Sequence, residues 1–122
     1  MLYMLLCYNN EATVMGWTQE EDDAVMARLS VVHDRLTAQG KLGPSGRLQA
    51  TETARTLVKT DPPFVIDGPY AETKEQFLGF YLLDCDSMDD ALDAARQLGE
   101  ANPGGAYEVR PMRLFVPGLA VG

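Results

Sequence analysis

The chain has 122 residues, 46% of them apolar and 23% charged, which is enough for one domain with its own core. Its 18 acidic and 10 basic side chains give a formal net charge of −8. An acidic surface repels phosphate, which argues against nucleic acid and anionic membranes as partners. The apolar start of the chain is too short to span a bilayer and lacks the basic flank of a secretion signal, so we expect a cytoplasmic protein.

Two cysteines, Cys7 and Cys85, lie within apolar, strand-like runs. They have no C-x-x-C spacing and no neighbouring histidines, which argues against a zinc or redox site. We expect buried free thiols. The chain also contains no phosphate-binding glycine loop, nucleophile elbow or dinucleotide fingerprint, so the sequence predicts neither a cofactor nor a metal.

The first third of the chain is predicted to form a strand and a long helix. Residues 2–8 are apolar at every position, so both faces of this strand should be covered. Thr18 and Glu21 have the spacing of a capping box, and the helix that they begin should run to about Gln39, with Gly40 as its stop. One face of this helix is apolar: Val25, Leu29, Val32 and Leu36.

The rest of the chain is predicted to hold more strands and a second helix. Residues 43–46 read as a turn, and residues 47–50, 54–59 and 64–66 as short strands of a small meander. A strong strand covers 78–85, and Ser87 caps a helix whose apolar face holds Ala91, Leu92, Ala95 and Leu98. Residues 102–105 end this helix, residues 107–115 form a last strand, and residues 117–122 form a tail. Pro111 places the last strand at an edge or a bulge.

This order is strand, helix, strands, helix, strand, the βαββαβ pattern of a ferredoxin-like α+β fold with an antiparallel sheet. Both helices cover one face of such a sheet. Because the first strand is apolar on both faces, something must cover the other face, since large apolar patches are rarely left exposed. We expect a second copy there, sheet against sheet, in a dimeric α+β barrel.

The candidate catalytic residues are His33 and Asp67. His33 is the only histidine and lies at the border of the apolar helix face, where packing can hold an imidazole toward a cleft. Asp67 ends an apolar strand just before Gly68 and Pro69, where its carboxylate can either satisfy donors of the turn or take part in proton transfer. A surface histidine and a well-formed turn are the structural alternative.

Two further side chains are candidates for substrate contact. Tyr70 offers a phenol at the corner of the loop that follows Asp67. Arg47 follows the turn of residues 43–46, and its guanidinium can anchor an anionic group.

Residues 67–75, Asp-Gly-Pro-Tyr-Ala-Glu-Thr-Lys-Glu, resemble the signature of the DGPF (DGPFAETKE) branch of the YCII-related proteins, with Tyr70 in place of the usual Phe. Residues 79–87 (Gly-Phe-Tyr-Leu-Leu-Asp-Cys-Asp-Ser) and 108–111 (Glu-Val-Arg-Pro) are similar to other motifs of the family. The resemblance covers nearly the whole chain and implies a single YCII-related domain over residues 1–122.

The resemblance also implies a ferredoxin-like fold that dimerises into a barrel, with a His and Asp pair in a cleft as a proposed catalytic centre. By position this pair maps onto His33 and Asp67. Members of the DGPF branch often occur beside extracytoplasmic-function sigma factors, which makes a sigma factor a candidate partner.

Three functions follow as hypotheses. The leading one is an enzyme that acts on a small organic molecule without a cofactor, with His33 as general base or acid and Asp67 orienting it or sharing the proton transfer. The reaction type, whether lyase, isomerase or hydrolase, stays open. The second is a non-catalytic ligand-binding or regulatory dimer that works with a sigma factor. The third is a cofactor-free monooxygenase, which requires a closed apolar pocket with aromatic walls.

Overall fold

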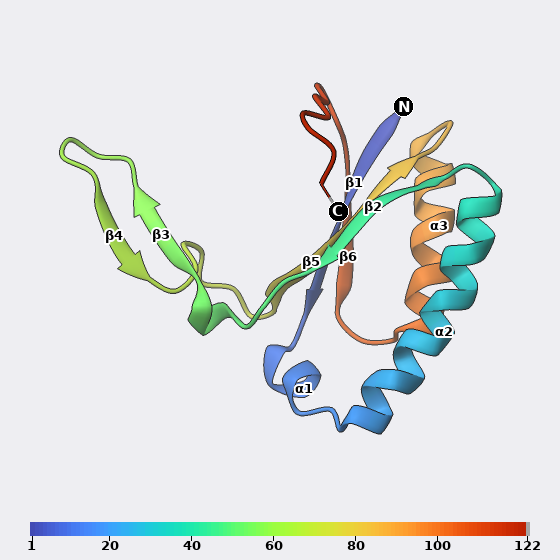
Figure 1. The fold of residues 1–122 in the computed structure, drawn as a ribbon, viewed down its shortest axis with the longest axis horizontal. Coiled ribbons are helices and arrows are strands. Elements are labelled where there is room, and N and C mark those ends of the chain that lie inside the picture. The colour runs from blue at the N-terminus through green and yellow to red at the C-terminus, as the bar shows by residue number, and fades with distance from the viewer. Residues whose placement is uncertain (122) are drawn as a thin grey trace.

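The computed structural model describes residues 1–121, and Gly122, the last residue of the predicted tail, lies outside the described residues. A sheet with two long helices forms the main body, and a hairpin projects from it (Figure 1). The elements are β1 (Leu2–Asn9), α1 (Glu11–Met15), α2 (Gln19–Ala38), β2 (Leu42–Arg47), the 3₁₀ helix η1 (Thr51–Thr53), β3 (Arg55–Val58), β4 (Phe64–Asp67), β5 (Gln76–Asp84), α3 (Met88–Ala101) and β6 (Ala106–Pro111). No helix among the described residues is long and apolar enough to cross a membrane.

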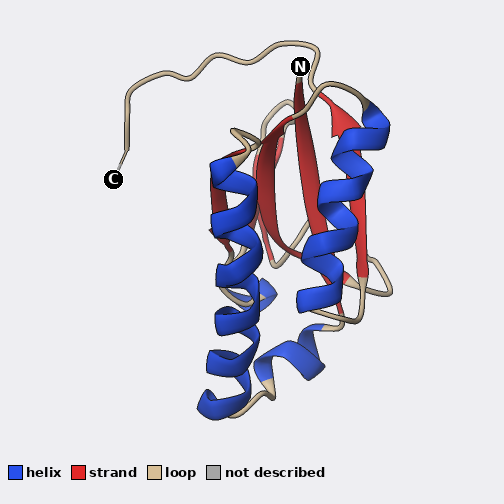
Figure 2. Cartoon of the chain, turned by 90° about the vertical axis from the view of Figure 1, so that its right-hand side faces the viewer, coloured by secondary structure: helices blue, strands red, loops and turns tan. Residues whose placement is uncertain are grey.

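The main sheet has the strand order β2-β5-β1-β6, and every neighbouring pair in it is antiparallel. Helix α2 connects β1 to β2, and α3 connects β5 to β6. Both helices lie on the same face of the sheet (Figure 2). This is the βαββαβ, ferredoxin-like arrangement, so the predicted α+β fold is confirmed. The last strand lies at an edge of the sheet, as Pro111 indicated.

Helix α2 begins and packs as its sequence predicts. The Thr18 hydroxyl accepts a hydrogen bond from the backbone N–H of Glu21 at 3.1 Å, and the Glu21 carboxylate accepts one from the backbone N–H of Thr18 at 3.2 Å. This reciprocal capping box satisfies two of the donors that a helix start leaves free. The predicted apolar face is the buried one: Val25, Leu29, Val32 and Leu36.

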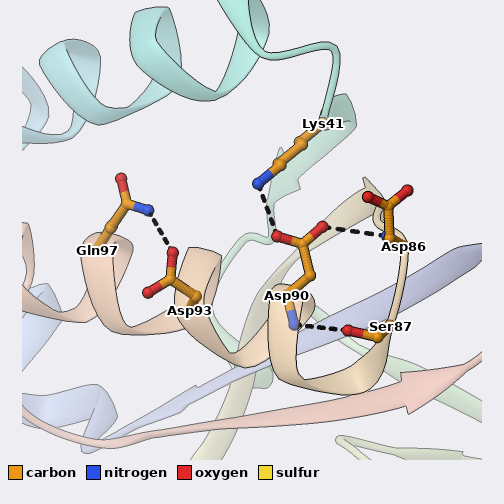
Figure 3. Close-up of polar contacts among 6 residues, drawn as sticks. All are labelled: Lys41, Asp86, Ser87, Asp90, Asp93 and Gln97. Atoms are coloured by element: carbon orange, nitrogen blue, oxygen red, sulfur yellow. Dashed lines mark hydrogen bonds and ion pairs between the residues drawn. The ribbon is translucent and has the colours of Figure 1, made fainter.

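An ion pair joins the segment that follows α2 to the start of α3. Lys41, just after α2, contacts Asp90 in the first turn of α3 at 2.7 Å (Figure 3). The Asp90 carboxylate also accepts a hydrogen bond from the backbone N–H of Asp86, and Ser87 caps the helix as predicted. Helix α3 then buries a face of small side chains against the sheet: Ala91, Ala94, Ala95, Leu98 and Ala101.

The two faces of the sheet differ in burial. Tyr3 and Leu5 of β1 face the helices and are buried in the core with Leu83 of β5. The alternate residues Met4 and Leu6 point to the opposite face, because successive side chains of a strand alternate. They are only half-buried, since neither α2 nor α3 covers that face.

The predicted three-stranded meander is wrong. Strands β3 and β4 pair only with each other, in a separate two-stranded sheet that is an insertion between β2 and β5. All four residues of β4 are exposed, and the exposed apolar side chains of this hairpin lie on both of its faces: Leu57, Phe64, Val65 and Ile66. The Glu11 carboxylate ties the base of the hairpin to α1 by accepting two hydrogen bonds from Thr51.

Three element boundaries also differ from expectation. Residues 43–46, predicted as a turn, lie inside edge strand β2, where Pro44 falls at an irregularity of the register with β5, a position at which strands tolerate proline. The segment after Asn9, predicted as a loop, contains the short helix α1, which Asn10 caps. The last strand ends at Pro111, and residues 117–121 form no helix or strand.

Candidate active site

A cavity of about 280 Å³ lies between the middle of α2 and the main sheet, and the segment around α1 contributes Val14 and Trp17 to its wall. The sheet contributes two rows of neighbouring residues on its helix-facing side. In one row Tyr107, Cys7, Gly79 and Arg47 lie side by side across β6, β1, β5 and β2. In the next, Tyr81 pairs with Ser45. Helix α2 contributes Met26, Leu29 and His33, and the segment between α1 and α2 contributes Trp17.

Two glycines allow the cavity floor to form. A Cβ atom on Gly79 would lie 2.7 Å from the Gly46 carbonyl oxygen, and one on Gly46 would lie 2.9 Å from the Phe80 ring. Glycine at these places therefore lets β2 and β5 approach closely. Both glycines line the cavity, and Gly79, which lies in the helix-facing row, also leaves its floor free of a side chain.

His33 and Tyr81 form the polar centre of the cavity. His33 Nε2 lies 2.8 Å from the Tyr81 hydroxyl oxygen, and the rings meet edge to face at a centroid distance of 5.4 Å. Burial lowers the pKa of His33, and the nearby Asp34 carboxylate offsets this only in part. Burial also raises the pKa of Tyr81. At neutral pH the pair is therefore an uncharged imidazole beside a protonated phenol, which is a base and an acid in direct contact.

Arg47 forms a two-point ion pair with Asp22 in the first turn of α2. Its Nη2 lies 2.7 Å from Asp22 Oδ1, and its Nη1 lies 3.4 Å from Asp22 Oδ2. The guanidinium lowers the pKa of Asp22, chiefly through this hydrogen bond. The pair joins β2 to α2 beside the cavity.

The Cys7 thiol lines the same cavity but is not a nucleophile at neutral pH. Burial raises its pKa to about 12, so it stays protonated. Tyr107, its neighbour on β6, also has a pKa raised to about 12 by burial. Both cysteines are free thiols as expected, with Cys85 buried and Cys7 half-buried.

The structure brings together two of the four predicted site residues. His33 and Arg47 both line the cavity. Asp67 lies on the projecting hairpin, where its side chain is 89% exposed and contacts Arg55 at 3.2 Å. Tyr70 is 76% exposed beyond the end of β4. Within one chain, His33 and Asp67 therefore do not meet. Asp67 ends strand β4 of the hairpin, which forms a sheet separate from the main one.

A second hollow, of about 430 Å³, lies at the base of the hairpin and is lined partly by Pro69, Ala71 and Thr73 of that stretch. No charged side chain lines it. The first cavity is the stronger candidate site, since it holds the acid–base pair.

Sequence reasoning did not select Tyr81 or Asp22 as site residues. Tyr81 lies in the nearly continuous apolar run of residues 77–85, where its phenol could not be told from an ordinary core residue. Asp22 carried a usable signal, because residues 22, 26, 29 and 33 recur at three- and four-residue steps along one face of α2, and the last three line the cavity.

Comparisons with known proteins include a close relative in sequence and a likeness to a solved structure. An uncharacterized protein of Rhizobium meliloti (strain 1021) is 54% identical over 120 residues, 97% of each chain. The solved structure of 5-chloro-2-hydroxyhydroquinone dehydrochlorinase from Burkholderia phenoliruptrix, in complex with 2,5-dihydroxybenzoquinone, matches with a TM-score of 0.54 over 93% of this chain and 94% of that chain. At 16% identity this likeness concerns the fold alone. The family model of the YCII-related domain matches residues 1–116, and the chain therefore belongs to the YCII-related family.

Proposed function

We propose that the protein is an acid–base enzyme that acts on a small organic molecule bound in the cavity between α2 and the sheet. The observation that carries the proposal is the 2.8 Å contact between His33 Nε2 and the Tyr81 hydroxyl inside that cavity. The chemistry is proton transfer, which these side chains can perform themselves. The residues 67–75 further suggest that the protein belongs to the DGPF branch.

In the proposed step His33 acts as a base through Tyr81. The Tyr81 phenol is protonated, so it cannot accept a second proton from a substrate unless it gives up its own. It can take a proton on its oxygen while its own hydrogen passes to the lone pair of His33 Nε2. The substrate then carries the electron pair of the broken bond, and the imidazolium holds the proton until it is returned or released. Lyase and isomerase reactions both begin with such a step.

The name of the structural relative supports this class of reaction. A dehydrochlorinase removes hydrogen and chloride from its substrate, which requires a base, and that protein binds a single-ring quinone. For the present chain we propose only the shared part, proton abstraction from a small molecule.

The test is proton exchange in D₂O. A panel of small ring compounds with acidic C–H groups, including 2,5-dihydroxybenzoquinone, would be followed by NMR with wild-type protein, Tyr81→Phe and His33→Gln. Both variants should lower the exchange rate about 10²- to 10⁴-fold, the usual range for general acid–base catalysis. Asp67→Asn, on the hairpin, is the matched control and should exchange at the wild-type rate. Equal loss in Asp67→Asn, or full activity in Tyr81→Phe, would contradict the relay.

We also propose that the protein is a homodimer. The hairpin is apolar on both faces, and an isolated two-stranded hairpin is marginally stable in water. The uncovered face of the main sheet adds a second apolar surface. A second copy that covers both surfaces removes them from water.

The exposed hairpin also supports a second candidate function, a non-catalytic dimer that binds a ligand and a regulatory partner such as a sigma factor. In that case His33→Gln and Tyr81→Phe would leave partner binding intact, whereas changes in the hairpin would abolish it. The aromatic side chains of the cavity meet one requirement of the third candidate, a monooxygenase, and oxygen consumption with the same compounds would distinguish it.

A further inference from the structure

The charged groups around the cavity are distributed unevenly. The chain has 18 acidic side chains and only 10 basic ones. Yet the lining residues include no Asp, Glu or Lys, and Arg47 is the one lining residue with a fixed charge, since His33 is neutral. A cavity in an acidic protein whose single formal charge is positive favours a ligand with a negative charge.

The contact with Asp22 holds the guanidinium of Arg47 in place but leaves several of its N–H donors free to bind a ligand. A guanidinium has five N–H donors in a fixed plane. Asp22 takes one from each terminal nitrogen, and no other described acceptor bonds to Arg47. The Nε–H and one N–H on each terminal nitrogen stay available. Because Asp22 fixes the plane of a long, otherwise exposed side chain, less conformational entropy is lost when a ligand binds to it.

The walls and size of the cavity indicate the rest of the ligand. Trp17, Tyr81 and Tyr107 place aromatic surface around it, and aromatic side chains pack well against planar rings. A volume of about 280 Å³ is at the small end for ligand pockets, which suits a compound with one ring.

We propose that the ligand is a planar single-ring compound with a negatively charged oxygen, which Arg47 binds, and that Asp22 is a positioning residue that holds Arg47 for this purpose. The inference rests on the proposed function of the cavity, because it names the class of substrate for the same site. It concerns binding only, so it can be tested without turnover.

The test compares benzoate with benzamide, which have the same shape but differ in charge, by titration calorimetry. Wild-type protein should bind benzoate roughly tenfold or more tightly than benzamide, as expected for charge-assisted hydrogen bonds. Arg47→Gln should bring the two affinities together. Asp22→Ala should lower the benzoate affinity severalfold and leave benzamide unchanged, and Asp22→Asn, which keeps an acceptor, should have a smaller effect.

Glu20→Gln is the matched control, since it removes an exposed charge from the same turn of α2 without a contact to Arg47. It should keep the wild-type preference. If Asp22→Ala lowers only the melting temperature, Asp22 is a structural anchor and its positioning role is wrong. If Asp22→Ala raises the benzoate affinity, Asp22 competes with the ligand, and the role is also wrong. Equal or undetectable binding of both compounds to the wild type would overturn the ligand class, while the exchange test above would still decide the acid–base function.

Discussion

At the scale of single residues, the position of His33 determines what its imidazole can do. The ring lies half-buried between α2 and the sheet, so its neutral form is favoured. A neutral imidazole has a free lone pair, which is what a base requires. The same burial keeps the Tyr81 proton on its oxygen, so each member of the pair is held in the form that the other needs.

The lowered pKa of His33 predicts how stability depends on pH. In the unfolded chain the His pKa is about 6.5, whereas the pKa of His33 in the folded chain is lower. Between these two pKa values the unfolded state binds more protons than the folded state. The contribution of His33 to the free energy of unfolding is therefore fully present above about pH 6.5 and is lost as the pH falls through its lowered folded pKa. Urea unfolding between pH 8 and pH 5 should show this decline, and His33→Gln should flatten it. A slope that is the same in the variant would assign the decline to other groups.

At the scale of elements, the pairing of β2 with β5 sets the width of the cavity. The strands meet at Gly46 and Gly79, and Arg47 follows directly beside Gly79. A side chain at this crossing would displace the edge strand that carries Arg47.

Gly79→Ala tests this close approach. Its Cβ would lie 2.7 Å from a backbone oxygen that cannot move aside, so the free energy of unfolding should fall by about 1–3 kcal/mol. Gly99→Ala, a substitution within α3, is the control, because the added Cβ would lie 3.8 Å from the Tyr107 ring, an ordinary contact distance. There alanine should be neutral or should stabilise the protein by roughly 0.5–1 kcal/mol. Urea denaturation measures both, and an equal response of the two variants would argue against strain at Gly79.

How much the sequence could predict depends on how local each signal is. The capping box at Thr18 and the apolar spacing of α2 act within a few residues, so both were readable. Strand β2 could not be predicted because Pro44 and two glycines are typical turn residues, and only pairing with a distant strand makes them extended.

The residues of the site were also predictable only where their signal is local. His33 was found because it is unique, whereas its partner Tyr81 depends on how α2 lies over the sheet. Asp67 lies apart from His33 within one chain, on a hairpin whose separation from the main sheet has no local signal in the sequence.

At the scale of the whole molecule, large apolar side chains are exposed outside the core. Phe64 and Val65 on the hairpin are 51% and 62% exposed. These side chains and the uncovered sheet face are the surfaces that the proposed second copy would cover.

Sedimentation equilibrium tests the proposed dimer. The wild-type chain of 13.4 kDa should sediment with twice that mass at micromolar concentration. Val65→Asp should shift the equilibrium toward the single chain, because it places a charge in the proposed interface. Val31→Asp, a substitution of an equally exposed valine on α2, is the control and should leave the mass unchanged. A wild-type chain that stays monomeric would refute the proposal.

The cavity lies between α2 and the sheet, so the proposed second copy, which would cover the opposite face of the sheet and the hairpin, would leave the cavity of each chain as it is. Two joined copies would then hold two complete and separate sites, with one ligand bound per chain. Occupancy of one site would leave the affinity of the other unchanged, so the binding curve would be hyperbolic. Dilution of the protein would reduce its resistance to unfolding while its affinity for the ligand stayed constant.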